Sequence, residues 1–145
     1  RMGYAILPPE FVKTFDLYNV NIASCACTFS QHAAIEALHG PQDSVSNMVS
    51  EFRTRRDYLV EALNAIDGIS CTVPRGAFYA FANISETGMS SAEAASKLLD
   101  EAGVAVLSGA SFGPCGEGYI RLSYATSMAR LEAAVERIAA FLAKR

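Results

Sequence analysis

The stretch "GYIRLSYA" (residues 118–125) reads as a short β-strand with an arginine, Arg121, at its centre. Because side chains alternate along a strand, Arg121 shares one face with Tyr119 and Ser123, and the other face is apolar. That apolar face, expected to point to the core, carries Ile120, Leu122 and Tyr124. A guanidinium stays charged and matches a carboxylate with two hydrogen bonds. The strand therefore indicates a cation available to a carboxylate, although a surface arginine, or one paired with an internal acid, has the same spacing.

The elements around this strand indicate a small mixed domain. Further strand-like runs occupy residues 70–74, 76–84 and 104–107. A capping box, Ser90 with Glu93, opens a helix that Gly103 ends. After residue 68 the order is strand, strand, helix, strand, strand, helix. This order predicts an α+β fold, in which helices pack on one side of a small sheet of largely antiparallel strands.

A long helix is expected before this domain. Its apolar residues recur on one stripe from residue 45 to residue 66, with the charged residues largely off that stripe. Residues 2–7 form an apolar run closed by two prolines, which predicts a buried strand, and a helix follows. A lone strand leaves its backbone groups unpaired. We therefore expect residues 1–43 to pair elsewhere or to be a remnant of something larger.

Composition excludes several kinds of function. The 145 residues carry 12 basic and 15 acidic side chains, and a net charge of −3 argues against nucleic-acid binding. The basic run "RTRR" (residues 53–56) reads as a solvated helix face. No apolar run is long enough to cross a bilayer. The four cysteines form no CxxC pair and only two histidines are present, so we expect no metal site and a reducing, cytoplasmic location.

Several motifs resemble those of one enzyme family when they are taken in order. They are "RMGY" followed by two prolines, "GAFYAF" (residues 76–81), "GASFG" (residues 109–113) and "GYIRLSYA". In this order they resemble the class I aminotransferases, which are pyridoxal-phosphate enzymes of fold type I. The long helix is similar to the connecting helix of the aspartate-aminotransferase-like branch. The resemblance covers the whole chain.

The resemblance implies roles for individual residues. Arg121 matches the arginine that binds the α-carboxylate of the substrate, and Arg1 matches the arginine that pairs with the cofactor phosphate. Phe78 and Tyr79 fall in the segment that lines the substrate side of the pocket. Taken by itself, Gly76 before these aromatic residues suggests a close backbone approach, and a hairpin glycine followed by core aromatic residues fits the same pattern. The implied full-length enzyme is a homodimer that uses pyridoxal 5'-phosphate, an amino acid and a 2-oxo acid.

The resemblance also implies a domain organisation. Residues 1–43 would be a strand-helix remnant of the large α/β cofactor-binding domain. Residues 44–66 would be the connecting helix, and residues 67–145 the small C-terminal domain. The chain is therefore expected to be a C-terminal portion of the enzyme.

The chain departs from the family pattern in three places. The Schiff-base lysine of the family lies just upstream of the phosphate arginine, and the lysines here, at positions 13, 97 and 144, lie outside that context. Ser108 precedes the "GASFG" motif where the family often has proline, which leaves the rigidity of this loop open. The segment "SCACTF" (residues 24–29) has no arginine for a side-chain carboxylate. We expect no catalytic residue in this chain and no activity of the chain alone. A lyase of the same fold type and a non-catalytic carboxylate-binding module remain as alternatives.

Overall fold

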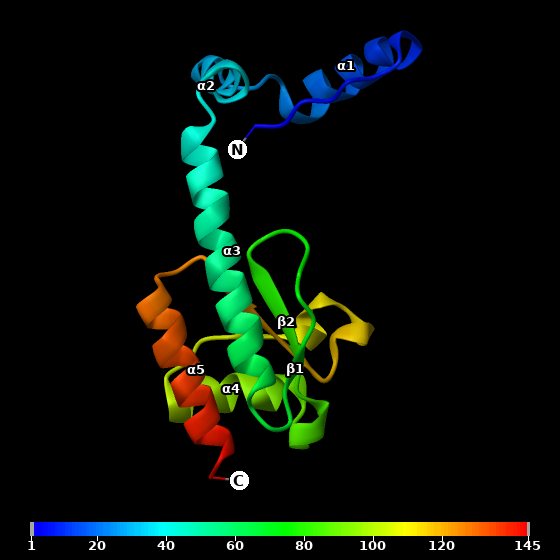
Figure 1. Ribbon diagram of the computed structural model, residues 1–145. Helices are drawn as coiled ribbons and strands as arrows, with labels where there is room; N and C mark the ends of the chain where they lie inside the picture. Colours follow the sequence, from blue (N-terminus) through cyan, green and yellow to red (C-terminus); the bar gives the residue numbers. More distant parts are fainter. Residues whose placement is uncertain (1, 145) are drawn as a thin grey trace. The chain divides into compact units, whose positions relative to one another are not determined.

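The computed structural model describes residues 2–144, and its contacts divide the chain into two compact units (Figure 1). One unit ends at Ser46 and the other begins at Asn47. Each unit is described by itself. No helix among the described residues is long and apolar enough to cross a membrane.

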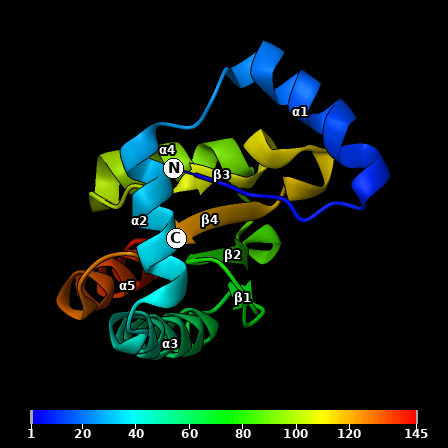
Figure 2. The ribbon, with the colours of Figure 1, turned by 90° about the horizontal axis from the view of Figure 1, so that it is seen from above.

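The second unit is built on a four-stranded sheet. Its strands are β1 (Ser70–Cys71), β2 (Tyr79–Asn83), β3 (Leu107–Ser108) and β4 (Tyr119–Ser123). Their order is β1-β2-β4-β3, and every neighbouring pair is antiparallel. Figure 2 shows β4 between β2 and β3. The expected small antiparallel sheet is therefore confirmed, and its central position belongs to the strand that carries Arg121.

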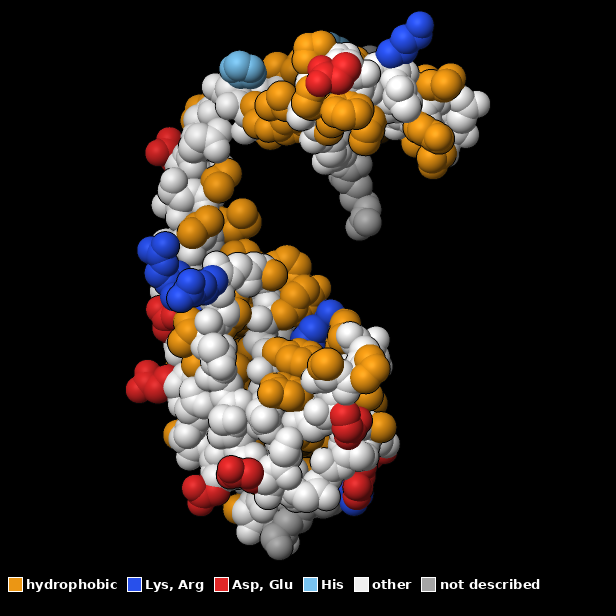
Figure 3. Space-filling view, turned by 90° about the vertical axis from the view of Figure 1, so that its right-hand side faces the viewer, with side chains coloured by type: hydrophobic (Ala, Val, Ile, Leu, Met, Phe, Trp, Pro, Cys, Tyr) orange, Lys and Arg blue, Asp and Glu red, His pale blue; other side chains and the backbone are white. Residues whose placement is uncertain are grey.

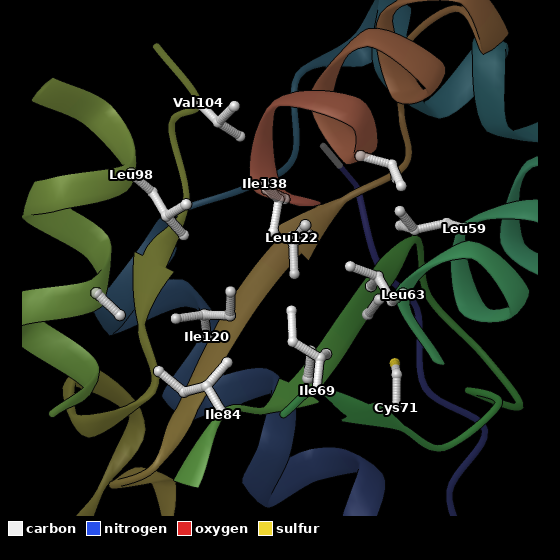
Figure 4. Packing of buried hydrophobic residues seen from close by; sticks show 14 of the residues in the cluster. Leu59, Leu63, Ile69, Cys71, Ile84, Leu98, Val104, Ile120, Leu122 and Ile138 are labelled. Atoms are coloured by element: carbon white, nitrogen blue, oxygen red, sulfur yellow. The ribbon is translucent and has the colours of Figure 1, made fainter. Parts of the chain in front are cut away.

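Three helices surround the core on one face of this sheet. They are α3 (Asp43–Asn64), most of which belongs to the second unit, α4 (Ser91–Ala102) and α5 (Met128–Leu142). Figure 4 shows Leu59 of α3, Leu98 of α4 and Ile138 of α5 around Ile120 and Leu122 of β4. All five side chains are buried. The predicted α+β layer and the predicted apolar face of β4 are confirmed.

Local chemistry explains where α4 begins and ends. The hydroxyl of Ser90 accepts a hydrogen bond from the backbone N–H of Glu93 at 3.2 Å, as the capping box predicts. Gly103 ends the helix with a φ of 64°, a left-handed conformation that glycine adopts without strain. Ala94 and Leu98 of this helix are buried in the core, whereas Leu99 is 54% exposed.

Short 3-10 turns lie between the strands and helices of this unit. They are Ser85–Thr87, Gly109–Phe112 and Pro114–Gly116. The last two lie between β3 and β4, where the sequence indicated a glycine-rich loop.

The first unit contains α1 (Pro9–Ala23) and α2 (Thr28–His39) and has no buried side chain in either helix. Pro9 begins α1, where a missing N–H costs nothing. Figure 3 shows the apolar side chains gathered over this part of the chain. The strand expected over residues 2–7 does not form, because a strand requires a ladder partner and the described residues provide none there. Ile6 is accordingly 90% exposed.

Candidate functional site

Arg121 lies in the middle of the sheet and on its outer face. In the antiparallel register it is opposite Phe81 of β2 and Leu107 of β3. Ile120 and Leu122, its neighbours along the chain, are in the core, so the side chain of Arg121 points away from the core. Arg121 is half-buried. The backbone of a central strand therefore holds this cation rigidly at the surface of the sheet.

Two aromatic rings hold the guanidinium of Arg121. Its central carbon lies 4.2 Å from the ring centroid of Tyr79 and 4.3 Å from that of Phe112. Such contacts stabilise a cation by about 0.5–2 kcal/mol each and fix the plane of the group. Arg121 takes part in none of the ion pairs formed by the described residues. The charge is thus positioned and partly desolvated, and no acid among residues 2–144 neutralises it.

A pocket of about 170 Å³ opens beside this cation. Tyr79, Arg121 and Ser123 line it together with Ala105, Val106 and Leu107. The polar groups come from β2 and β4, and the apolar ones come from the start of β3 and the two residues before it. An acid group of a small molecule can enter this pocket with its oxygens toward the guanidinium and its carbon atoms toward the apolar side.

Phe78 is next to the pocket but does not line it. Its ring packs against the ring of Tyr79 at 4.6 Å and against that of Phe52 at 5.9 Å, measured between centroids. Its backbone oxygen accepts a hydrogen bond from the N–H of Tyr124 at 3.0 Å. Of the two aromatic residues suggested for the substrate side, the structure brings Tyr79 to Arg121 and places Phe78 behind Tyr79.

Phe112 belongs to the site, although the sequence analysis missed it. It lies in the loop between β3 and β4, and its ring meets Arg121 and also the ring of Phe81 at 6.2 Å. Phe81 in turn stacks on Tyr119 at 5.0 Å, so the outer face of β2 and β4 is largely aromatic. The motif "GASFG" marked the loop but did not show where its phenylalanine points.

A buried serine fixes the loop that carries Phe112. Ser91 is fully buried, and its hydroxyl donates to the carbonyl of Gly116 at 3.3 Å and accepts from the N–H of Tyr119 at 3.1 Å. Its backbone N–H donates to the carboxylate of Glu117 at 2.9 Å. No proline precedes "GASFG", and these hydrogen bonds of Ser91, which lies on α4, hold the loop instead. No pattern in the sequence distinguishes Ser91 from the capping serine beside it.

Close backbone packing occurs in this loop and not at Gly76. A Cβ atom placed on Gly109 would overlap the carbonyl oxygen of Gly116, and one on Gly116 would overlap that of Gly109. A Cβ atom on Gly76 would meet nothing within 4 Å. Among the described residues, no close backbone approach is therefore found at Gly76. The unusual backbone lies one residue further, at Ala77, which has a φ of 58°.

The residues expected to hold a cofactor are not among those that surround Arg121. Arg1, the residue expected to pair with a cofactor phosphate, lies outside the described residues. None of the three lysines lines the pocket beside Arg121. Lys97 instead pairs with Glu93 along α4.

Comparison with known proteins gives one consistent result. The family model for "Aminotransferase class I and II" matches residues 1–138. A curated relative, the aspartate aminotransferase of Rhizobium meliloti (strain 1021), is 41% identical over 150 residues, which cover 97% of this chain and 36% of that protein. The chain spans little more than a third of the length of the curated relatives it matches.

Solved structures resemble the chain over nearly its whole length. The aspartate aminotransferase from Rhizobium meliloti matches with a TM-score of 0.85 and 38% identity, over 94% of this chain and 36% of that one. The aromatic aminotransferase from Pyrococcus horikoshii OT3 matches with a TM-score of 0.88 and 38% identity, over 95% and 37%.

Proposed function

This chain belongs to the class I and II aminotransferase family, and from that premise we propose that it is the C-terminal part of a longer enzyme. That enzyme would move an amino group between an amino acid and a 2-oxo acid. In it, residues 1–43 would belong to the large cofactor-binding domain, residues 44–66 would form the connecting helix, and residues 67–145 would form the small domain. The match over residues 1–138 and the shared fold support this assignment.

Within that enzyme, Arg121 would bind the α-carboxylate of the substrate. One observation carries this proposal: the guanidinium is held between the rings of Tyr79 and Phe112 and has no ion-pair partner among the described residues. A fixed guanidinium can donate two parallel hydrogen bonds to a carboxylate. The two rings reduce its contact with water, which strengthens the attraction for an incoming anion.

The role of the remaining residues is to orient the substrate. A carboxylate held by two hydrogen bonds cannot rotate, so the Cα–H bond of the amino acid keeps one direction. Tyr79 would hold the guanidinium from β2, and Phe78 would support Tyr79 from behind. Pyridoxal 5'-phosphate, when bound, supplies the electron sink for removal of the Cα proton. We propose that Arg1 pairs with the phosphate of this cofactor.

The chain alone should not catalyse transamination. Its three lysines are Lys13, Lys97 and Lys144, and we propose that none of them bonds to the cofactor. The lysine would come from the remainder of the enzyme. We also propose that the complete enzyme is a homodimer in the cytoplasm. Two observations favour this: the cysteines are free, and α1 and α2 bury no side chain of their own.

The test is a substitution of Arg121 in the longer enzyme, with Arg121→Gln compared with Arg130→Gln. Arg130 is an exposed arginine on α5 and serves as the matched control. Two charge-assisted hydrogen bonds, at about 1.5–3 kcal/mol each, predict a loss in kcat/KM on the order of 10²–10⁴ for Arg121→Gln. The control should keep the wild-type value.

Three results would count against the proposal. Equal kcat/KM values for Arg121→Gln and the control would remove Arg121 from substrate binding. Release of elimination products in place of keto-acid exchange by the wild-type enzyme would assign it to the lyases of the same fold. A wild-type protein that binds carboxylates without turnover would be a binding module.

A further inference from the structure

A second pocket, of about 230 Å³, lies on α3 and is lined by three arginines. Arg53 and Arg56 come from the helix, and Arg75 comes from the segment between β1 and β2. The residues that line this pocket do not line the pocket of Arg121. Figure 3 shows basic side chains gathered over the middle of α3. In a chain with a net charge of −3, this concentration of positive charge requires an explanation.

One of the three arginines has a structural role. The guanidinium of Arg56 pairs with the carboxylate of Asp57 at 2.7 Å and donates to the carbonyl of Pro74 at 3.5 Å. It therefore ties the segment that contains Arg75 to α3. This tie keeps the charge of Arg75 beside the charges of the helix.

The other two arginines are not neutralised. Arg53 and Arg75 take part in none of the ion pairs among residues 2–144, and both are exposed. Glu51, the other acid of this part of α3, pairs with Arg55 outside the pocket. Asp57 balances one of the three charges that line the pocket, and two remain. Two like charges in one pocket repel each other, and a bound anion removes that repulsion.

The walls of the pocket strengthen its field. Phe52 and the buried Tyr124 contribute aromatic surface, and the hydroxyl of Tyr124 is occupied by the carbonyl of Ala77 at 3.0 Å. A cleft that is lined by charge of one sign and has apolar walls concentrates the electric field and attracts counter-ions.

We propose that this pocket binds a phosphate group, free or carried as a monoester, between Arg53 and Arg75. A carboxylate has two oxygens in one plane, which a single guanidinium can satisfy. A phosphate presents three or four oxygens in different directions, which suits guanidinium groups that reach it from α3 and from the segment before β2. This assignment does not depend on the role of Arg121.

The test is isothermal titration calorimetry of the full chain, with any sequence that flanks it in the natural protein, at constant ionic strength set by chloride. The protein is saturated with pyridoxal 5'-phosphate, which fills the phosphate site proposed at Arg1, and inorganic phosphate should then bind with one further site per chain. The double variant Arg53→Gln/Arg75→Gln should bind it at least tenfold more weakly, and Arg130→Gln should bind it as the wild type does. Glycerol phosphate distinguishes a free phosphate from a monoester as the ligand. If it binds as tightly as inorganic phosphate or more tightly, the ligand is a monoester, and if it binds more weakly, the ligand is free phosphate.

Several results would overturn this proposal. They are the absence of saturable phosphate binding by the wild type, unchanged affinity in the double variant, and equal weakening by Arg130→Gln. Succinate that binds as tightly as phosphate would also contradict it, because the argument requires a tetrahedral anion. Both substituted arginines are exposed, and an unchanged midpoint of urea unfolding would show that the double variant is folded.

Discussion

Replacing Ser91 with alanine tests whether α4 holds the loop that carries Phe112. The hydroxyl of Ser91 bonds the carbonyl of Gly116 and the N–H of Tyr119, and both bonds disappear in Ser91→Ala. Each buried polar group left without a partner costs about 1–3 kcal/mol. Two such groups are left in Ser91→Ala, and water can replace part of the lost bonding. We therefore expect the free energy of unfolding to fall by about 2–4 kcal/mol. Urea unfolding followed by circular dichroism measures this loss as a lower midpoint at an unchanged slope.

The same substitution at Ser96 is the control. Ser96 is on the same helix and is exposed, with its hydroxyl on Asp100, so Ser96→Ala should change stability by about 0.5 kcal/mol or less. In the longer enzyme, Ser91→Ala should also raise the KM for the amino acid, because a looser loop presents Phe112 to Arg121 less often. A Ser91→Ala protein as stable as Ser96→Ala would refute the claim that this hydroxyl fixes the loop.

Three further predictions concern the second unit. Gly109→Ala should destabilise the protein by several kcal/mol in urea unfolding, whereas Gly76→Ala, where a Cβ atom has open space, should leave the midpoint unchanged. Leu98→Ala should cost about 2–5 kcal/mol and Leu99→Ala much less, because only the first side chain is buried; equal losses would contradict the packing of α4. Burial raises the pKa of the Cys71 thiol, so its contribution to stability is present below the ordinary thiol pKa and is lost as pH rises through the raised value. Between roughly pH 8 and 10, the free energy of unfolding should therefore fall less steeply with rising pH in Cys71→Ala than in the wild type.

Regularly patterned elements could be predicted from the sequence. The alternation of side chains around Arg121 predicted the two faces of β4. The capping box of Ser90 and Glu93 predicted the start of α4, and Gly103 predicted its end. Both patterns depend on local geometry alone. The strand over residues 2–7 was wrong for the opposite reason. Its apolar run met the local requirement, but a strand exists only when a second strand completes its hydrogen bonds.

The site was only partly predictable because its contacts join distant segments. Arg121 was singled out by its place in a recognisable strand, and Tyr79 was singled out together with Phe78 by the family resemblance. Phe112 reaches Arg121 from an irregular loop, and Ser91 fixes that loop from a helix. Neither contact follows from the spacing of residues. Gly76 has open space around it among the described residues, and the positive φ beside it lies at Ala77, which no glycine pattern marks.

The alternation along β4 has a consequence for engineering. Positions 120 and 122 belong to the core, while positions 119, 121 and 123 face outward, where the proposed carboxylate site lies. A library that randomises only the odd positions should therefore keep most members expressible while sampling new ligands. One that randomises the even positions should chiefly yield insoluble material.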